Sequence, residues 1–320
     1  MSTVEPADRF HMSVVKTAQQ SFMQPTESPW PVTPMAGMWS GLLFRVAKHW
    51  IAGESYEDAL KRAKESSARK VRCIINLLGE DSTSTQEIEA ATSEYIEVLN
   101  QLDTPKFQSC ISVKPTQLGL SKDKAVYRYN LERIVSKANS LGNFVWVDME
   151  GHEYTTETVD SYIEFRKKYD NIGIAIQSYL RRSVEDVNRI LDVNGMIRLV
   201  KGAYSESPDI VYKKRSEINQ NFSKLMRIIF ERGKWFAIAT HDEKLIKEAI
   251  MSSKVHHADD DFEFEMLMGI RDKRKLELVD QSYRVSEYIP YGKGWWAYSK
   301  RRMTEHKSNI FLLARSLISD

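Results

Sequence analysis

The feature that most constrains the fold of this chain is a regular alternation of short apolar runs with longer amphipathic stretches. Eight such runs occur after residue 70, and most are nearly continuous in apolar residues, as buried parallel strands require. The stretches between them, such as SVEDVNRILDVN, repeat apolar residues at helical spacing. Strand–helix repeats of this number over about 250 residues predict an α/β fold, a TIM-type (β/α)8 barrel. The expected strands lie within residues 71–79, 107–115, 143–151, 172–180, 196–204, 235–242, 262–269 and 282–292.

A doubly wound open sheet is the alternative fold. It is disfavoured because no GxGxxG motif follows the first run, where the sequence reads NLLGEDSTS.

The N-terminal part differs in composition from the rest. Five of the nine prolines fall within the first 40 residues, which predicts an irregular arm with one short helix around Met12–Ser21. A helical pattern then runs from Trp39 to Gly53, and Ser55 with Asp58 three residues later predicts a capped start of the next helix. We therefore expect residues 1–68 to form an N-terminal arm with helices and residues 69–320 to form the barrel.

Charge and cysteine content exclude several classes of protein. Lys and Arg number 46 against 44 Asp and Glu, and this balance gives no reason to expect a nucleic-acid partner. Cys73 and Cys110 lie in apolar runs and are expected to be reduced thiols. No apolar run reaches about 18 residues and the N-terminus lacks signal-peptide features, so a cytoplasmic location is expected.

Six of the eight runs end in polar or ionisable residues. A single such residue is typical of a solvated loop, but six together predict a site at the C-terminal mouth of the barrel, where barrel enzymes place their chemistry. The residues in question are Lys114, Asp148, Glu150, Gln177, Tyr179, Arg198, Lys201, Thr240, His241, Asp242 and Tyr288.

Arg198 stands inside an apolar strand. Its guanidinium cannot lose its proton, so its burial requires a partner. Either it forms an ion pair with Asp148 or Glu150 in the barrel wall, or it faces an electron-rich or anionic ligand. Gly202, four residues later, fits a close approach of backbone to a ligand.

The last helical segment places four polar residues on one face, at Tyr298, Arg301, Arg302 and Glu305. Such a run can be a solvated surface. Two adjacent guanidinium groups beside a barrel mouth also suit a carboxylate, which they can hold bidentately.

Taken together, these segments resemble the proline dehydrogenase (proline oxidase) family of FAD-dependent (β/α)8 barrels, and most closely its short monofunctional members. The likeness extends from about Ile51, through Leu78-Gly79-Glu80 and SVKPTQLG, to the C-terminal helix. The motifs that carry it are RLVKGAY, the ATH that ends the sixth run, YIPYG, and Y-x-x-R-R-x-x-E.

This resemblance implies oxidation of L-proline to Δ1-pyrroline-5-carboxylate, the first step of proline catabolism. A hydride would pass to N5 of non-covalent FAD, and the electrons to a quinone during a transient peripheral contact with a membrane; no metal is implied. Asp148 and Arg198 would be catalytic. The implied cofactor contacts are Met149, Gln177, Arg198, Lys201, Gly202, Ala203, Thr240, His241 and Glu305. The implied substrate contacts are Lys114, Tyr204, Leu267, Tyr288, Tyr298, Arg301 and Arg302.

Two residues depart from the family pattern. Glu265 stands where the family usually has Gln, and Glu287 stands where it usually has Arg or an apolar residue. Both are expected to add negative charge near the rim and to affect the substrate pocket more than the cofactor. The sequence leaves the choice between proline and hydroxyproline open.

Three other functions are the alternatives. The first is a flavin barrel similar to methylenetetrahydrofolate reductase, although an arginine pair suits a small carboxylate better than a flat pterin. The second is a metal-dependent barrel hydrolase, but its first strand usually carries His-x-His and this one reads CIINLLG. The third is a non-catalytic barrel. Candidate ligands for the hydrolase are His241, Asp242, His256 and His257.

Overall fold

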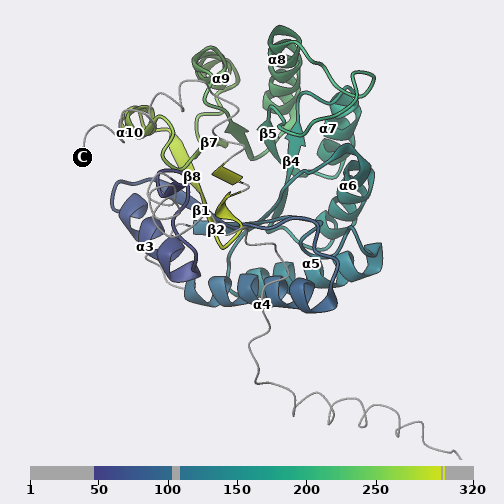
Figure 1. Cartoon of the computed structure of the whole chain (residues 1–320). Coiled ribbons are helices and arrows are strands. Elements are labelled where there is room, and N and C mark those ends of the chain that lie inside the picture. Colours follow the sequence, from purple (N-terminus) through teal and green to yellow (C-terminus); the bar gives the residue numbers. More distant parts are fainter. Residues whose placement is uncertain (1–46, 103–108, 297, 300–320) are drawn as a thin grey trace, which may run out of the picture. The chain divides into compact units, whose positions relative to one another are not determined.

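The computed structural model describes residues 47–102, 109–296 and 298–299. Within these ranges, eight parallel strands close into a barrel, each strand pairing with its neighbours in sequence and β8 with β1 (Figure 1). Every strand lies inside the apolar run that predicted it, so the (β/α)8 barrel is confirmed and the open sheet is wrong. The strands are β1 (Arg72–Leu77), β2 (Ser109–Val113), β3 (Val145–Val147), β4 (Ile172–Gln177), β5 (Met196–Val200), β6 (Phe236–Ala239), β7 (Phe262–Leu267) and β8 (Arg284–Tyr291).

Helices alternate with the strands along the chain and lie around them (Figure 1). They bury the outward-facing side chains of the strands, while the inward-facing ones fill the barrel, and this double burial explains why the strands are nearly continuous apolar runs. The helices are α3 (Tyr56–Ser67), α4 (Thr85–Leu102), α5 (Lys124–Ser140), α6 (His152–Arg166), α7 (Ser183–Asp192), α8 (Arg215–Arg232), α9 (Glu243–His256) and α10 (Asp272–Asp280).

The start of α3 is the one predicted from the sequence. The Asp58 N–H donates to Ser55 Oγ, and the Asp58 carboxylate accepts from the Ser55 N–H, which together form a capping box. The helix predicted around Met12–Ser21 lies outside the described residues, as does most of the pattern from Trp39. The residues of that pattern that are described include Trp50, which is buried in a small cluster.

Aromatic side chains occupy part of the barrel interior. Trp146 on β3 stacks on Trp235 with ring centroids 5.7 Å apart, and Phe144 packs edge-on against both. Cys73 and Cys110 are free thiols, as expected. In the part of the chain that the structure describes, no helix is both long enough and apolar enough to cross a membrane.

Candidate active site

The strand ends place the polar residues named above at one end of the barrel. Lys114 directly follows β2, Asp148 follows β3, Lys201 follows β5, and Thr240 follows β6. Because all strands are parallel, their C-terminal ends meet at a single mouth. Gln177 and Leu267 are the last residues of β4 and β7 and therefore belong to the same layer.

Asp148 is the centre of this site. Its Oδ2 accepts a hydrogen bond from Tyr288 Oη at 2.7 Å, and its Oδ1 accepts from Arg198 Nη1 at 2.9 Å and from Ser112 Oγ at 2.7 Å. Lys114 Nζ lies 3.8 Å from Oδ2. The Asp148 side chain thus pairs with a tyrosine and with two neighbouring cations.

Arg198 is only 3% exposed and lies between two carboxylates. Besides Asp148, Glu265 Oε2 approaches its Nε at 2.5 Å, and the guanidinium carbon lies 4.5 Å from the Trp146 ring centroid. The ion pair in the barrel wall is therefore present, with Glu265 rather than Glu150 as the second partner. The Nε contact lacks hydrogen-bond alignment, and Nη2 has no hydrogen-bond partner among the described residues. A buried donor of this kind can serve an electron-rich ligand atom.

Glu80 joins the site from the segment after β1. Its carboxylate lies 3.4 Å from Lys114 Nζ and accepts from Tyr204 Oη at 3.3 Å. Burial lowers the pKa of Lys114, but the surrounding acidic groups outweigh burial and raise that pKa well above its usual value, so the amine stays charged. Glu80 received no role from the sequence, although an ionisable residue just after a strand was the signal used for the other positions.

Glu150 does not contact Arg198. It accepts hydrogen bonds from the Thr116 N–H and hydroxyl, both at 2.8 Å, and its own carbonyl accepts from Gln177 Nε2 at 2.9 Å. Burial raises the pKa of Glu150 to about 7, against the opposing effects of Lys114 and Thr116. Met149, the residue between it and Asp148, is buried.

The loop after β5 is tied to the start of α9. Lys201 Nζ lies 2.8 Å from Asp242 Oδ2, and Asp242 also caps α9 by accepting from the Lys244 N–H. Gly202 has a φ of +103°, and a Cβ there would lie 2.2 Å from the Tyr179 ring. A side chain at this position would therefore meet Tyr179, and contact of the Gly202 main chain with a ligand remains a prediction.

Ala203 is exposed at the mouth. It follows Gly202 in a segment without regular secondary structure.

His241 Nε2 accepts a hydrogen bond from the Leu267 N–H at 3.0 Å. This contact places the ring proton on Nδ1 and occupies the nitrogen that a metal would need. Thr240 Oγ1 accepts from the Asp242 N–H at 3.1 Å.

The ligands expected for a metal-dependent hydrolase do not converge. Asp242 precedes α9 and His256 is the last residue of that helix, about 20 Å away at 1.5 Å per residue. Over the described ranges, no group of three or more metal-ligating side chains occurs.

The two departures from the family pattern do not lie at the rim, contrary to expectation. Glu287 points away from the barrel interior, because successive side chains alternate along a strand and Tyr288 faces inward. It is buried against α3 and α10, where it binds Arg62 at 2.9 Å and Lys275 at 2.6 Å. Glu265 faces inward but is buried beside Arg198.

The C-terminal helix motif is only partly described. Tyr298 is buried in an apolar cluster with Ala47, Trp50, Ile51 and Leu78, and its role in binding substrate remains a prediction. Arg301, Arg302 and Glu305 lie outside the described residues.

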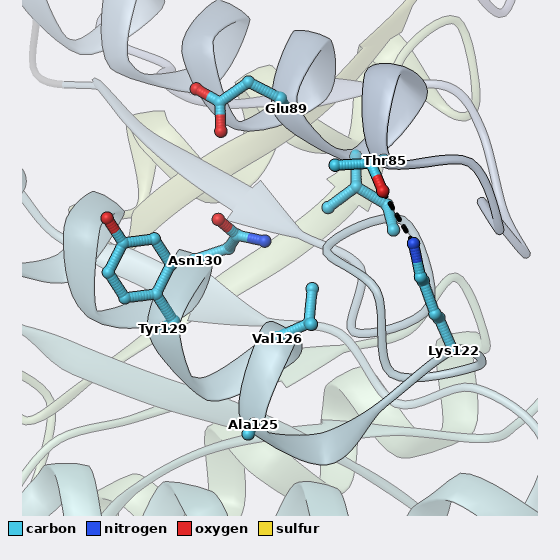
Figure 2. A pocket seen from close by; sticks show the side chains of 8 residues that line it. Thr85, Glu89, Lys122, Ala125, Val126, Tyr129 and Asn130 are labelled. Atoms are coloured by element: carbon cyan, nitrogen blue, oxygen red, sulfur yellow. Dashed lines mark hydrogen bonds between the residues drawn. The ribbon is translucent and has the colours of Figure 1, made fainter. Parts of the chain in front are cut away.

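A separate pocket of about 390 Å³ lies on the outside of the barrel, between α4 and α5 (Figure 2). Lys122 Nζ donates to Thr85 Oγ1 across it at 2.7 Å. None of the residues predicted to form the site line this pocket, so it is not the candidate active site.

A closed (β/α)8 barrel with paired charges at its C-terminal mouth defines the class of this protein as a barrel enzyme. The family model described as proline dehydrogenase matches residues 59–313. The chain belongs to the proline dehydrogenase family.

Relatives of known name agree with this membership. The chain is 32% identical over 281 residues to proline dehydrogenase 2 of Bacillus subtilis, covering 85% of this chain and 93% of the relative. It is 29% identical to proline dehydrogenase of Deinococcus radiodurans, covering 86% of this chain and 91% of that one.

Solved structures agree in fold. Proline utilization A of Bdellovibrio bacteriovorus matches with a TM-score of 0.78 and 26% identity over 84% of this chain and 33% of that chain. The corresponding protein of Corynebacterium freiburgense matches with a TM-score of 0.71 and 21% identity over 86% of this chain and 32% of that chain. The chain thus spans about a third of the length of these two proteins.

Proposed function

We propose that this protein is an FAD-dependent proline dehydrogenase that oxidises L-proline to Δ1-pyrroline-5-carboxylate in the first step of proline catabolism. We also propose that it passes the electrons to a quinone, from a cytoplasmic location with transient contact at the membrane surface. The observation that carries the proposal is the ion-paired centre of Asp148, Arg198 and Lys114 inside a chain that the proline dehydrogenase model matches over residues 59–313.

The residues at the mouth are compatible with FAD. Arg198 Nη2 is a buried donor without a hydrogen-bond partner among the described residues, and Ala203 is exposed beside Lys201. When bound, FAD would supply the hydride acceptor of the reaction. The residues proposed to hold it are Met149, Gln177, Arg198, Lys201, Gly202, Ala203, Thr240, His241 and Glu305.

Lys114 would bind the substrate carboxylate together with Arg301 and Arg302. Its amine keeps its charge because the neighbouring acidic groups raise its pKa. A small amino acid offers few groups for recognition, and its carboxylate is the strongest of them. Holding that group fixes the ring carbon next to nitrogen, which is catalysis mainly by positioning. Tyr204, Leu267, Tyr288 and Tyr298 are proposed to shape the remainder of the pocket.

Asp148 orients its neighbours rather than acting as a base. It already accepts hydrogen bonds from Arg198, Ser112 and Tyr288, so little acceptor capacity remains for a substrate proton. In the reaction, proline with its amine deprotonated would lose a hydride from the adjacent ring carbon, and its nitrogen lone pair would form the new C=N bond. The product is then protonated Δ1-pyrroline-5-carboxylate, which would release its N–H proton to solvent.

The proposal is tested by releasing and identifying the cofactor and by measuring turnover. Heat precipitation of the purified protein should leave FAD in the supernatant, and the protein should form Δ1-pyrroline-5-carboxylate from L-proline and a soluble quinone. Replacing Arg301 or Arg302 by Met should raise KM about 10- to 150-fold with bound FAD nearly unchanged, because each loses a charge-assisted hydrogen bond. A colourless protein that takes up no added FAD would refute the assignment.

A further inference from the structure

Arg198 has a second carboxylate partner inside the barrel, at one of the positions where this chain departs from the family pattern. Glu265 lies two residues before the end of β7 and is 3% exposed, and its Oε2 is 2.5 Å from Arg198 Nε. The guanidinium is therefore held between Asp148 and Glu265. No role in the function proposed above requires Glu265.

A second buried acid, Glu263, stands two residues earlier on β7 and therefore on the same inward-facing side, and it is also 3% exposed. Two neighbouring carboxyl groups that are both buried repel each other when both are ionised, so a single proton held between them is favoured. Ser286 Oγ donates to Glu263 Oε2 at 2.8 Å, and Arg72 Nη1 lies 3.8 Å from that same oxygen. Glu263 therefore contacts Ser286 and Arg72, whereas Glu265 contacts Arg198.

We propose, building on the function proposed above, that Glu265 and Glu263 form a proton-sharing carboxyl pair that positions Arg198 and sets how much of its positive charge reaches a bound flavin. With the proton on Glu265, Asp148 is the one counter-ion in contact with the guanidinium among the described residues. When the proton leaves, the Glu265 carboxylate neutralises more of that charge. Burial, together with the nearby acids, raises the pKa of Glu265 to about 8, so the change falls within an accessible pH range.

The other groups that face the pair come from the neighbouring strands. Arg72 and Arg198 remain charged throughout that range. Burial raises the pKa of Cys110 and of Tyr288 well above their usual values, so both remain neutral. Asp148, the other carboxylate that contacts Arg198, accepts hydrogen bonds from Ser112, Arg198 and Tyr288. A change in charge near pH 8 at this place is therefore assigned to the pair.

The pair is tested by the reduction equilibrium of the holoenzyme flavin, titrated with dithionite. Two electrons and one proton convert oxidised flavin to its anionic reduced form, which a nearby positive charge favours. At about pH 6, wild type and Glu265→Gln should agree within about twofold, whereas at about pH 9 the variant should favour the reduced flavin by about tenfold, or about 30 mV for a two-electron couple. If the flavin reduction equilibria of wild type and Glu265→Gln change with pH in parallel, the proposal is overturned.

Glu263→Gln provides a test of opposite sign. Without Glu263 there is no second acid to share the proton, and Glu265 is left ionised beside Arg198. This variant should therefore disfavour the reduced flavin at about pH 6, by about the same tenfold factor. A shift in the same direction as Glu265→Gln would contradict a shared proton. Glu157→Gln, an acid on α6 outside the barrel that binds Arg128, is the matched control and should leave the equilibrium unchanged.

Infrared spectroscopy of the flavin-free protein separates this inference from the proposed function. The protonated carboxyl band of the pair should be present in wild type near neutral pH, disappear as the pH rises, and be absent in both glutamine variants. If the protein binds no FAD, the proposed function fails while this measurement still decides whether the proton is shared. An unchanged carboxyl band in both variants would overturn the pair itself.

Discussion

At the scale of single residues, the site is organised by a few buried groups whose charges are matched. Asp148 orients Arg198 and Tyr288 before any ligand binds, because both donate to its two oxygens. Such preorganisation avoids the cost of ordering these groups during the reaction. Lys114 is less constrained, since its closest acidic contacts are at 3.4 and 3.8 Å. It is therefore the described cation best placed to bind an incoming carboxylate.

Replacement of Lys114 by Met should raise the KM for proline about 10- to 150-fold, because a charge-assisted hydrogen bond worth about 1.5–3 kcal/mol is lost. The matched control is Lys122→Met, which removes a lysine from the outer pocket and should leave KM unchanged. Steady-state kinetics with FAD content measured on the same samples provides the comparison. Equal KM values for the two variants would remove Lys114 from the substrate site.

Glu150 should make stability depend on pH. Burial is the largest cause that raises its pKa from 4.5 to about 7. Between these values the folded protein binds a proton that the unfolded chain does not, so stability falls as the pH rises through this window, by about 3 kcal/mol in all.

Glu150→Gln cannot ionise, so this part of the pH dependence should disappear. The free energy of unfolding in urea should therefore fall less from pH 5 to pH 8 in the variant than in wild type. If the two proteins lose stability in parallel over this interval, Glu150 does not take up the proton on folding.

At the scale of elements, the apolar runs predicted all eight strands because each strand of a barrel is buried on both faces. The capping residues likewise predicted the start of α3. The environment of Glu287 could not be predicted in the same way, since it depends on two helices distant in sequence. Arg62 on α3 and Lys275 on α10 meet at this one carboxylate, which joins both helices to β8.

Glu287→Gln should destabilise the fold by about 3 kcal/mol, because it takes the buried carboxylate away from Lys275 and Arg62 and leaves them with the more exposed Asp272 and Glu65. Glu243→Gln, which replaces a partly exposed partner of Arg271, should lower the free energy of unfolding by less than about 1 kcal/mol. Urea denaturation of both variants measures the difference. Similar small losses would show that the buried cations find other partners.

At the scale of the whole molecule, the sequence predicted which residues reach the mouth but not how they pair. The ends of parallel strands must meet, so strand order alone brings Lys114, Asp148 and Lys201 to one layer. The contacts of Asp148 with Arg198 and Tyr288 join positions 50 and 140 residues apart, and they depend on side-chain direction around the closed barrel. For the same reason Glu265 was expected at the rim and instead lies buried beside Arg198.

The central claim is that this barrel oxidises proline with a bound flavin, and anaerobic titration of the holoenzyme with L-proline tests it most directly. The absorbance of oxidised flavin should fall progressively as proline is added and should recover when a quinone is supplied. A flavin that stays oxidised in saturating proline, yet is reduced by dithionite in the same cuvette, would contradict the claim.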